Sequence, residues 1–169
     1  NYGHPAMPEG VEEGILRGMY LLRGADDAKV QLMGSGTILR EVLAGADLLQ
    51  EDFGVAADVW SATSFNELRR DGMAAERWNL LHPGGKPRTP YVAQCLADAP
   101  GVLIAASDYM KVLPDSIDRW LPRRLTTLGT DGFGRSESRA SLREFFEVDY
   151  RYVVVNFEEF AQARTAFTA

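Results

Sequence analysis

The sequence predicts one α/β domain with three layers and a largely parallel sheet. Strand-like apolar runs alternate with segments of helical periodicity along the whole chain, which is typical of parallel strands joined by crossover helices. The 169 residues suit a single domain, and a composition of 46% apolar and 25% charged residues is typical of a folded globular protein. No internal repeat or linker divides residues 1–169, so we expect a single domain.

The predicted strands are short apolar runs that end at glycine or at polar residues. The run at 102–106 is apolar throughout, as expected for a strand in a sheet that is covered on both faces. A shorter apolar run at 19–22 is closed by Arg23 and Gly24. We expect strands at 30–33, 55–62, 102–106 and 125–129.

In the first half of the chain, two longer helices follow these strands. Apolar residues recur every three or four positions over 37–52, and Gly54 suits the left-handed residue that ends such a helix. Ser64 and Glu67 have the spacing of a capping box for the next helix, which should run to 81. We expect a break in this second helix near Gly72.

The second half of the chain continues the alternation. Pro90 suits the start of a short helix, because proline has no N–H group to leave unpaired there. Ser107 or Asp108 is expected to cap a helix that runs to about Leu121 with a kink at Pro114. The expected helices are therefore 11–17, 37–52, 65–81, 90–96, 108–121 and 138–146.

Composition and chain termini exclude several classes of protein. The chain carries 18 Lys and Arg against 24 Asp and Glu, whereas proteins that bind nucleic-acid backbones carry a basic surface. The apolar runs are far shorter than the ~20 residues of a membrane span, and no signal peptide is visible. Lone Cys95 cannot form an internal disulfide. We expect a cytoplasmic protein with no nucleic-acid or membrane partner, which begins within a longer chain or has been trimmed, since it lacks an initiator methionine.

Two glycine-containing loops are candidate ligand sites. Gly34-Ser35-Gly36 lies between a strand and a helix like a dinucleotide-binding turn, but Leu39 replaces the third glycine, which favours a plain tight turn. The loop from Gly129 to Ser136 follows a strand end, where backbone amides and Arg135 could hold an anion. We favour a structural role, in which Phe133 anchors a contact between domains and the glycines allow the turn.

Catalytic side chains are scarce. His4 and His82 are the only imidazoles, and no Gly-x-Ser-x-Gly motif is present. Cys95 has the spacing of a buried helix residue, and buried thiols are usually inert. These three residues lie too far apart in the sequence for metal-ligand spacing. Residue chemistry alone therefore predicts no catalytic, cofactor-binding or metal-binding residue.

Several motifs are specific when taken together. Glu76-Arg77-Trp78-Asn79 is followed by His82-Pro83, and Gly129-Thr130-Asp131-Gly132-Phe133-Gly134-Arg135-Ser136 follows the last predicted strand. With these motifs the chain resembles the C-terminal domain of homodimeric bacterial pyruvate dehydrogenase E1 components, which are transketolase-like and depend on thiamine diphosphate. The matching segments cover almost the whole chain in the same order, up to residues 156–169, which depart from the small-residue helix of the family. They are 1–10, 12–15, 30–40, 63–72, 76–83, 107–111, 128–136 and 146–149.

This resemblance implies a three-layer α/β/α sandwich around a five-stranded, mostly parallel mixed sheet. It makes residues 19–23 the one antiparallel strand and places that strand beside 30–34. It also implies a helix at 152–155, capped by Asp149, although the apolar run there could equally be a strand. Val153 and Phe157 lie on one face of such a helix.

The resemblance further implies that this is a non-catalytic part of a longer E1 chain and inactive alone. The full enzyme uses thiamine diphosphate and Mg²⁺ to decarboxylate pyruvate and to acetylate the lipoyl group of dihydrolipoyl acetyltransferase (E2). The family's cofactor and metal residues all lie upstream of this segment. The implied partners are the upstream domains of the same chain, the second subunit of a homodimer, and E2. A free-standing nucleotide- or anion-binding α/β module that uses the Gly129–Ser136 loop is the alternative. The candidate residues for domain or dimer contacts are Phe65, Trp78, Asp131, Phe133 and Arg135.

Overall fold

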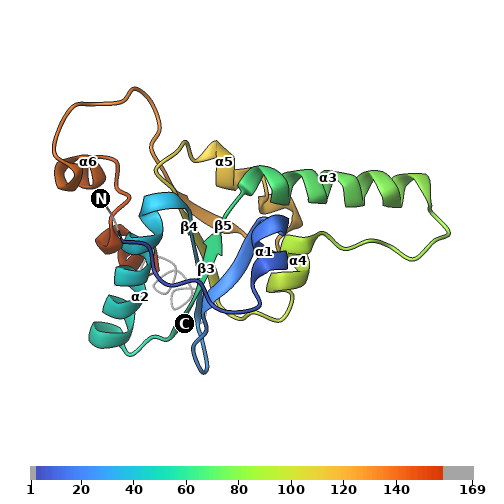
Figure 1. Cartoon of the computed structure of the whole chain (residues 1–169), viewed down its shortest axis with the longest axis horizontal. Coiled ribbons are helices and arrows are strands. Elements are labelled where there is room, and N and C mark those ends of the chain that lie inside the picture. Colours follow the sequence, from blue (N-terminus) through green and yellow to red (C-terminus); the bar gives the residue numbers. More distant parts are fainter. Residues whose placement is uncertain (1–2, 158–169) are drawn as a thin grey trace, which may run out of the picture.

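The computed structural model, which describes residues 3–157, has a five-stranded sheet between two layers of helices (Figure 1). The order of strands across the sheet is β1-β3-β2-β4-β5, with β1 antiparallel and the other four parallel. The predicted three-layer fold and its mixed sheet are confirmed. The strands are β1 Met19–Arg23, β2 Val30–Gly34, β3 Ala57–Ala62, β4 Val102–Ala106 and β5 Leu125–Leu128.

The helices agree with the predicted ones in the first half of the chain and differ between β4 and β5. A further helical stretch covers 150–157, the last residues that the structure describes. The helical elements are α1 Glu12–Arg17, η1 Gly36–Ile38, α2 Leu39–Phe53, α3 Phe65–Leu81, α4 Tyr91–Leu96, α5 Val112–Asp115, η2 Asp118–Trp120 and α6 Arg139–Phe145.

The antiparallel strand lies beside a different neighbour from the one expected. β1 pairs with β3, with Met19 opposite Ala62 and Leu21 opposite Trp60. The expected pairing with residues 30–34 is wrong, because β3 and β4 occupy both edges of β2. β1 therefore forms one edge of the sheet.

Each face of the sheet has its own apolar core. Val30 and Leu32 point to the face covered by α2 and by the helix at 150–157. Met33 points to the opposite face, where Leu68 of α3 and Leu96 of α4 cover it. This alternation follows from the period of two along a strand, and it explains why β2 and β4 are buried along their whole length.

A hydrogen-bonded chain of side chains crosses the second core. Gln31 is fully buried on β2, and its Oε1 accepts a hydrogen bond of 2.8 Å from the indole Nε1 of Trp60. Its Nε2 donates to Asp58 Oδ2 at 2.9 Å, and Asp58 Oδ1 accepts the backbone N–H of Ala25 at 2.9 Å. These bonds satisfy the side-chain polar groups of Gln31 and join β2, β3 and the turn after β1.

The predicted cap of α3 is confirmed, and the predicted break is wrong. Ser64 Oγ accepts the Glu67 N–H at 3.1 Å, but the Glu67 carboxylate binds Arg70 and does not complete a capping box. The helix passes Gly72 without interruption, because Trp120 packs directly against the backbone there. A Cβ at position 72 would lie 2.5 Å from a carbon of the Trp120 ring.

The single helix expected at 108–121 is also wrong. The segment forms only the short elements α5 and η2, and Ser107 Oγ accepts the Tyr109 N–H across a turn. Two aspartates of this segment bind β5: Asp115 Oδ1 accepts the Thr127 hydroxyl, and Asp118 Oδ1 accepts the Leu125 N–H at 2.7 Å. These bonds hold the segment against β5 instead of allowing one continuous helix.

The helix at 150–157 confirms the expectation for 152–155. Asp149 is buried at its start, and its Oδ1 accepts the Arg151 N–H at 2.9 Å, as a capping carboxylate does. Val153 is fully buried against α2, close to Gly45. Residues 158–169, which belong to the stretch that departs from the family pattern, lie outside the described part of the chain.

The Gly72–Trp120 contact predicts an unusual mutational result. Gly72→Ala should lower the free energy of unfolding by about 1–3 kcal/mol, because the added methyl group displaces the Trp120 ring. In a Trp120→Ala background the same change should be neutral or stabilising by up to ~1 kcal/mol, since only the better helix propensity of alanine remains. Urea unfolding of the four proteins measures both effects. Equal effects of Gly72→Ala in the two backgrounds would contradict this contact.

Tyr91 predicts a loss of stability in alkali. Its hydroxyl donates to the Met19 carbonyl at 3.0 Å, and burial raises its pKa to about 12 from the usual value of about 10. The unfolded phenol therefore ionises first, and unfolding becomes more favourable as the pH rises between these two values. Tyr91→Phe should lower the free energy of unfolding near neutral pH by about 0.5–1.5 kcal/mol. As the pH is raised, the variant should lose less additional stability than the unsubstituted protein. Urea unfolding across this pH range tests it, with exposed Tyr150→Phe as the control.

Candidate functional site

A cavity lies at the carboxyl edge of the parallel strands, beside the loop at 129–136. The chain leaves β2 toward β3 on one side and leaves β4 toward β5 on the other, so the loops after β2 and β4 diverge. Such a point of divergence is where open α/β sheets form a crevice. Ser35 and Ser107 lie at its base, with their hydroxyls 3.0 Å apart, and Ser35 N–H donates to the Ala106 carbonyl.

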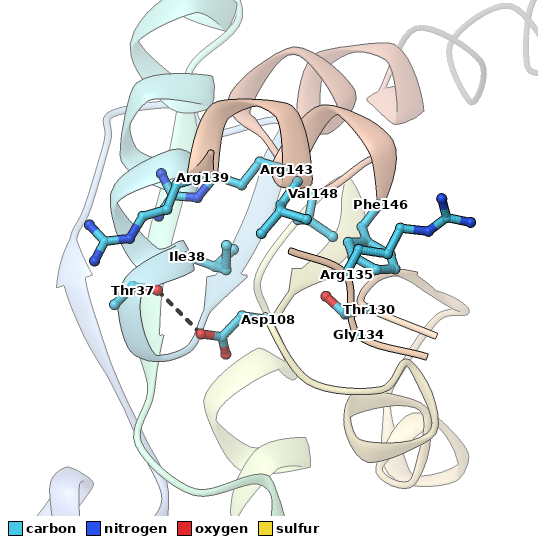
Figure 2. Close-up of a pocket in the computed structure, with 11 residues that line it drawn as sticks. Thr37, Ile38, Asp108, Thr130, Gly134, Arg135, Arg139, Arg143, Phe146 and Val148 are labelled. Carbon is cyan, nitrogen blue, oxygen red and sulfur yellow. Dashed lines mark hydrogen bonds between the residues drawn. The ribbon is translucent and has the colours of Figure 1, made fainter. Parts of the chain in front are cut away.

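A cavity of about 420 Å³ is lined by residues that follow these strands, among them Thr37, Asp108 and Thr130 (Figure 2). Thr37 Oγ1 donates to Asp108 Oδ2 at 3.2 Å on one side of it. Much of the remaining wall is apolar. The apolar side chains are Ile38, Leu142, Phe146 and Val148.

The arginines around this cavity do not converge on a common point. Figure 2 shows Arg135 and Arg139 on opposite sides of the cavity, and the Arg135 guanidinium is directed away from the Thr37–Asp108 pair. Arg143 is committed elsewhere, because its Nη1 lies 2.5 Å from Glu41 Oε1 of α2. Glu41 Oε2 also accepts the Tyr150 N–H, so this carboxylate joins α2 to α6 and to the final helix. The ion pair between Arg143 and Glu41 thus supports the fold.

The loop from Gly129 to Ser136 has a fixed base and a projecting tip. Thr130 N–H donates to the Tyr109 carbonyl at 2.8 Å, and Asp131 Oδ1 accepts the Lys111 N–H at 3.1 Å. At the tip, Phe133 is 96% exposed. Arg135 lies over the Phe145 ring, with its Cζ 4.1 Å from the ring centroid. Asp131 and Arg135 thus make defined contacts within the chain, whereas the Phe133 side chain is almost entirely in solvent.

The other candidate residues lie elsewhere. Phe65 is 3% exposed within the core beneath α3, so it is no part of the exposed surface. Trp78 lies near the end of α3, which extends to the opposite end of the molecule from the loop at 129–136 (Figure 1). The structure therefore does not bring Trp78 and Phe133 into one patch.

Trp78 belongs to an ordered arm formed by the end of α3 and the following loop. Its indole stacks on the His82 ring at 3.6 Å between centroids, and the Arg88 Cζ lies 3.5 Å from the indole centroid. His82 Nδ1 donates to the Trp78 carbonyl at 2.9 Å. Asn79 both donates to the Arg88 carbonyl and accepts its N–H, so the loop is fixed to the helix. Sequence reasoning missed this clamp, because nothing in the local pattern pairs Asn79 with residue 88.

The described residues offer little for catalysis or metal binding. Within residues 3–157 no group of three or more His, Cys, Asp or Glu side chains could hold a metal ion. Burial raises the pKa of the Cys95 thiol, which lowers its thiolate fraction. In the same part of the chain, no helix has the length and apolar character required to cross a bilayer.

Comparison with known proteins gives consistent results. Residues 18–149 match the model of the transketolase-like TK C-terminal domain. The chain is 59% identical over 161 residues to the pyruvate dehydrogenase E1 component of Pseudomonas aeruginosa. This match covers 92% of the chain and 18% of that protein. The pyruvate dehydrogenase E1 component of Escherichia coli is 54% identical over 158 residues, and that match also covers 92% of this chain and 18% of the relative.

Solved structures support the fold. Transketolase from Leishmania mexicana superposes with a TM-score of 0.60 at 18% identity, over 89% of this chain and 19% of that one. A split-gene transketolase, described as an inactive beta4 tetramer, superposes with a TM-score of 0.55 at 16% identity. The match covers 83% of this chain and 41% of that one.

The sequence relatives indicate the family and show that the chain matches only a small part of their length. The chain spans about 18% of the length of these pyruvate dehydrogenase E1 components. The matched family model covers most of the chain, including all five strands. This chain therefore belongs to the transketolase-like C-terminal domain family.

Proposed function

We propose that this chain is the C-terminal domain of a pyruvate dehydrogenase E1 chain and that it packs against other parts of that enzyme without carrying its chemistry. The observation that carries this proposal is the exposed Phe133 on a loop with a fixed base. A large apolar side chain held in solvent marks a surface meant for a neighbour. The high identity to E1 components over nearly the whole chain supports the assignment.

The rest of the enzyme supplies the cofactor site in this proposal. Thiamine diphosphate is held through a divalent cation, and Mg²⁺ requires several oxygen ligands in a defined geometry. The described residues present no such group, and Asp108 is the single carboxylate that lines the cavity at the sheet edge. These residues do not fit the cofactor. The complete chain would decarboxylate pyruvate and acetylate the lipoyl group of dihydrolipoyl acetyltransferase, as a homodimer in the bacterial cytoplasm.

A nucleotide- or anion-binding module is the second candidate. The cavity at the carboxyl edge of β2 and β4 favours it, because open α/β sheets place ligands at this position. The outward direction of Arg135, and the commitment of Arg143 to Glu41, argue against an anion at its centre. Titration with inorganic phosphate and with a nucleoside triphosphate would separate the two candidates, since only the second expects saturable binding.

Phe133 provides the first test of the packing role. In the full-length enzyme, Phe133→Ala should weaken dimer or domain packing by about 1–3 kcal/mol, less than the ~3–5 kcal/mol for truncation of a core phenylalanine. Sedimentation measures dimer dissociation, and the decarboxylation rate is measured at saturating enzyme concentration. Phe53→Ala, an exposed phenylalanine at the end of α2, is the matched control. A collapsed rate with an unchanged dimer would instead assign the loop a direct catalytic role.

The isolated domain provides the second test. It should neither bind thiamine diphosphate in the presence of Mg²⁺ nor decarboxylate pyruvate, because its residues do not provide the ligands. Calorimetry on the domain, with the full-length enzyme as positive control, measures binding. Magnesium-dependent saturation of the domain alone would refute the proposed division of labour.

A further inference from the structure

A groove between α3 and the segment from α5 to η2 has no partner within the described chain. Its volume is about 800 Å³, and its walls are formed by α3 and by the segment from α5 to η2. Three apolar side chains on its walls are exposed: Met73, Leu80, which is 73% exposed, and Val112. Trp120 lines the groove and is held in place by its indole N–H, which donates to Glu76 Oε1 at 2.9 Å. The groove is thus apolar in part and rigid.

One face of α3 contributes a regular stripe to this groove. Five residues of α3 line the groove, at positions 69, 73, 76, 77 and 80. Except for the adjacent pair 76 and 77, successive members are three or four positions apart, so all five lie on one side of the helix. The order along the stripe is Arg69, Met73, Glu76, Arg77 and Leu80. Glu76 and Arg77 occupy its middle, and the two apolar residues flank them at equal distance.

The charges in the groove are balanced but mostly unpaired. Three arginines and three carboxylates line it, and one ion pair is present among them, between Arg119 and Glu76 at 2.9 Å. Asp115 and Asp118 accept only neutral donors, a hydroxyl and a backbone N–H. Arg69 and Arg77 have no hydrogen bond or ion pair with the described residues. Two positive and two negative groups therefore remain for an outside partner.

We propose that α3 of a second copy of this chain occupies the groove, antiparallel to the first and related to it by a two-fold axis between Glu76 and Arg77. This inference rests on the proposed packing role and names the face through which two copies meet. The symmetry places Met73 opposite Leu80 of the second copy, and Glu76 opposite its Arg77. Each contact occurs twice, as an isologous interface requires.

The stripe favours a second copy over an upstream domain because it is complementary to itself. When a second α3 of the same sequence lies antiparallel to the first, apolar side chains face apolar side chains and acidic side chains face basic ones. Like charges that faced each other would repel the two copies. In this arrangement opposite charges face each other, and the charged residues that line each groove sum to a net charge of zero.

Disulfide trapping in the full-length enzyme tests the register directly. In a chain whose native cysteines are replaced, including Cys95→Ser, the pair Met73→Cys and Leu80→Cys should form a covalent dimer on mild oxidation. The two positions lie seven residues apart on one helix, about 10 Å, which is too far for a bond within one chain. The pair Met73→Cys and Leu81→Cys is the control, because position 81 is also exposed but is turned about 100° around the helix. Equal trapping by both pairs, or none by the first, would overturn the proposal.

A charge reversal adds a second readout. Arg77→Glu removes no hydrogen bond or ion pair among the described residues, so the fold should be unaffected. It should slow trapping several-fold, because the new carboxylate faces Glu76 of the other copy. Arg124→Glu makes the same change at an exposed site away from the groove and should have no effect. An unchanged trapping rate in Arg77→Glu would contradict the proposed register.

The outcomes separate this inference from the proposed function. A full-length enzyme that decarboxylates pyruvate and sediments as a dimer, yet forms no 73–80 disulfide, would refute the α3 interface and leave the proposed function intact. In that case another domain covers the groove. A chain that traps at 73–80 but does not decarboxylate pyruvate would refute the proposed function alone.

Discussion

Gln31 is the buried polar group on which the order of the sheet depends. Burying an amide without partners is costly, and the network of Trp60 and Asp58 meets this requirement from β3. β3 must therefore lie directly beside β2, with its polar residues on the same face as Gln31. The same network fixes the turn after β1 through the Ala25 N–H, which guides β1 to the free edge of β3.

The sheet order in turn positions the exposed features of the domain. With β3 and β4 on either side of β2, the loops after β2 and β4 separate, and the cavity lined by Thr37 and Asp108 lies there. α3 leaves β3 on the side of Met33 and Trp60, and its first half is held there by Phe65 and Leu68. Its second half carries few buried residues, which is why the arm and groove remain available to partners.

Local signals predicted the elements well, and distant contacts account for the errors. The left-handed Gly54 and the Ser64 cap depend on residues within four positions, and both are observed. The helix that starts at Asp149 is also observed, but the family resemblance predicted it, because the local apolar run also suited a strand. The neighbour of β1 depends on a residue of β3 far along the chain, and Gly72 depends on Trp120.

The candidate contact residues divide in the same way. Phe133 was expected at a surface because glycines surround it, and the loop does expose it. Phe65 has a similar apolar character but follows a helix cap directly, and the first turn of α3 turns it into the core. The stack of Trp78 with His82 and Arg88 joins residues whose pairing depends on the course of the loop at 82–90, and periodicity carries no information about it.

The ordered arm has a thermodynamic consequence for any association it makes. Asn79 and Trp78 already hold the loop that follows α3, so the conformational entropy of that loop is lost during folding and not on binding. Association through the arm is then a rigid-body process, whose heat-capacity change reflects only the apolar area covered at the contact. Coupled folding would add the burial of a newly ordered segment to that signal.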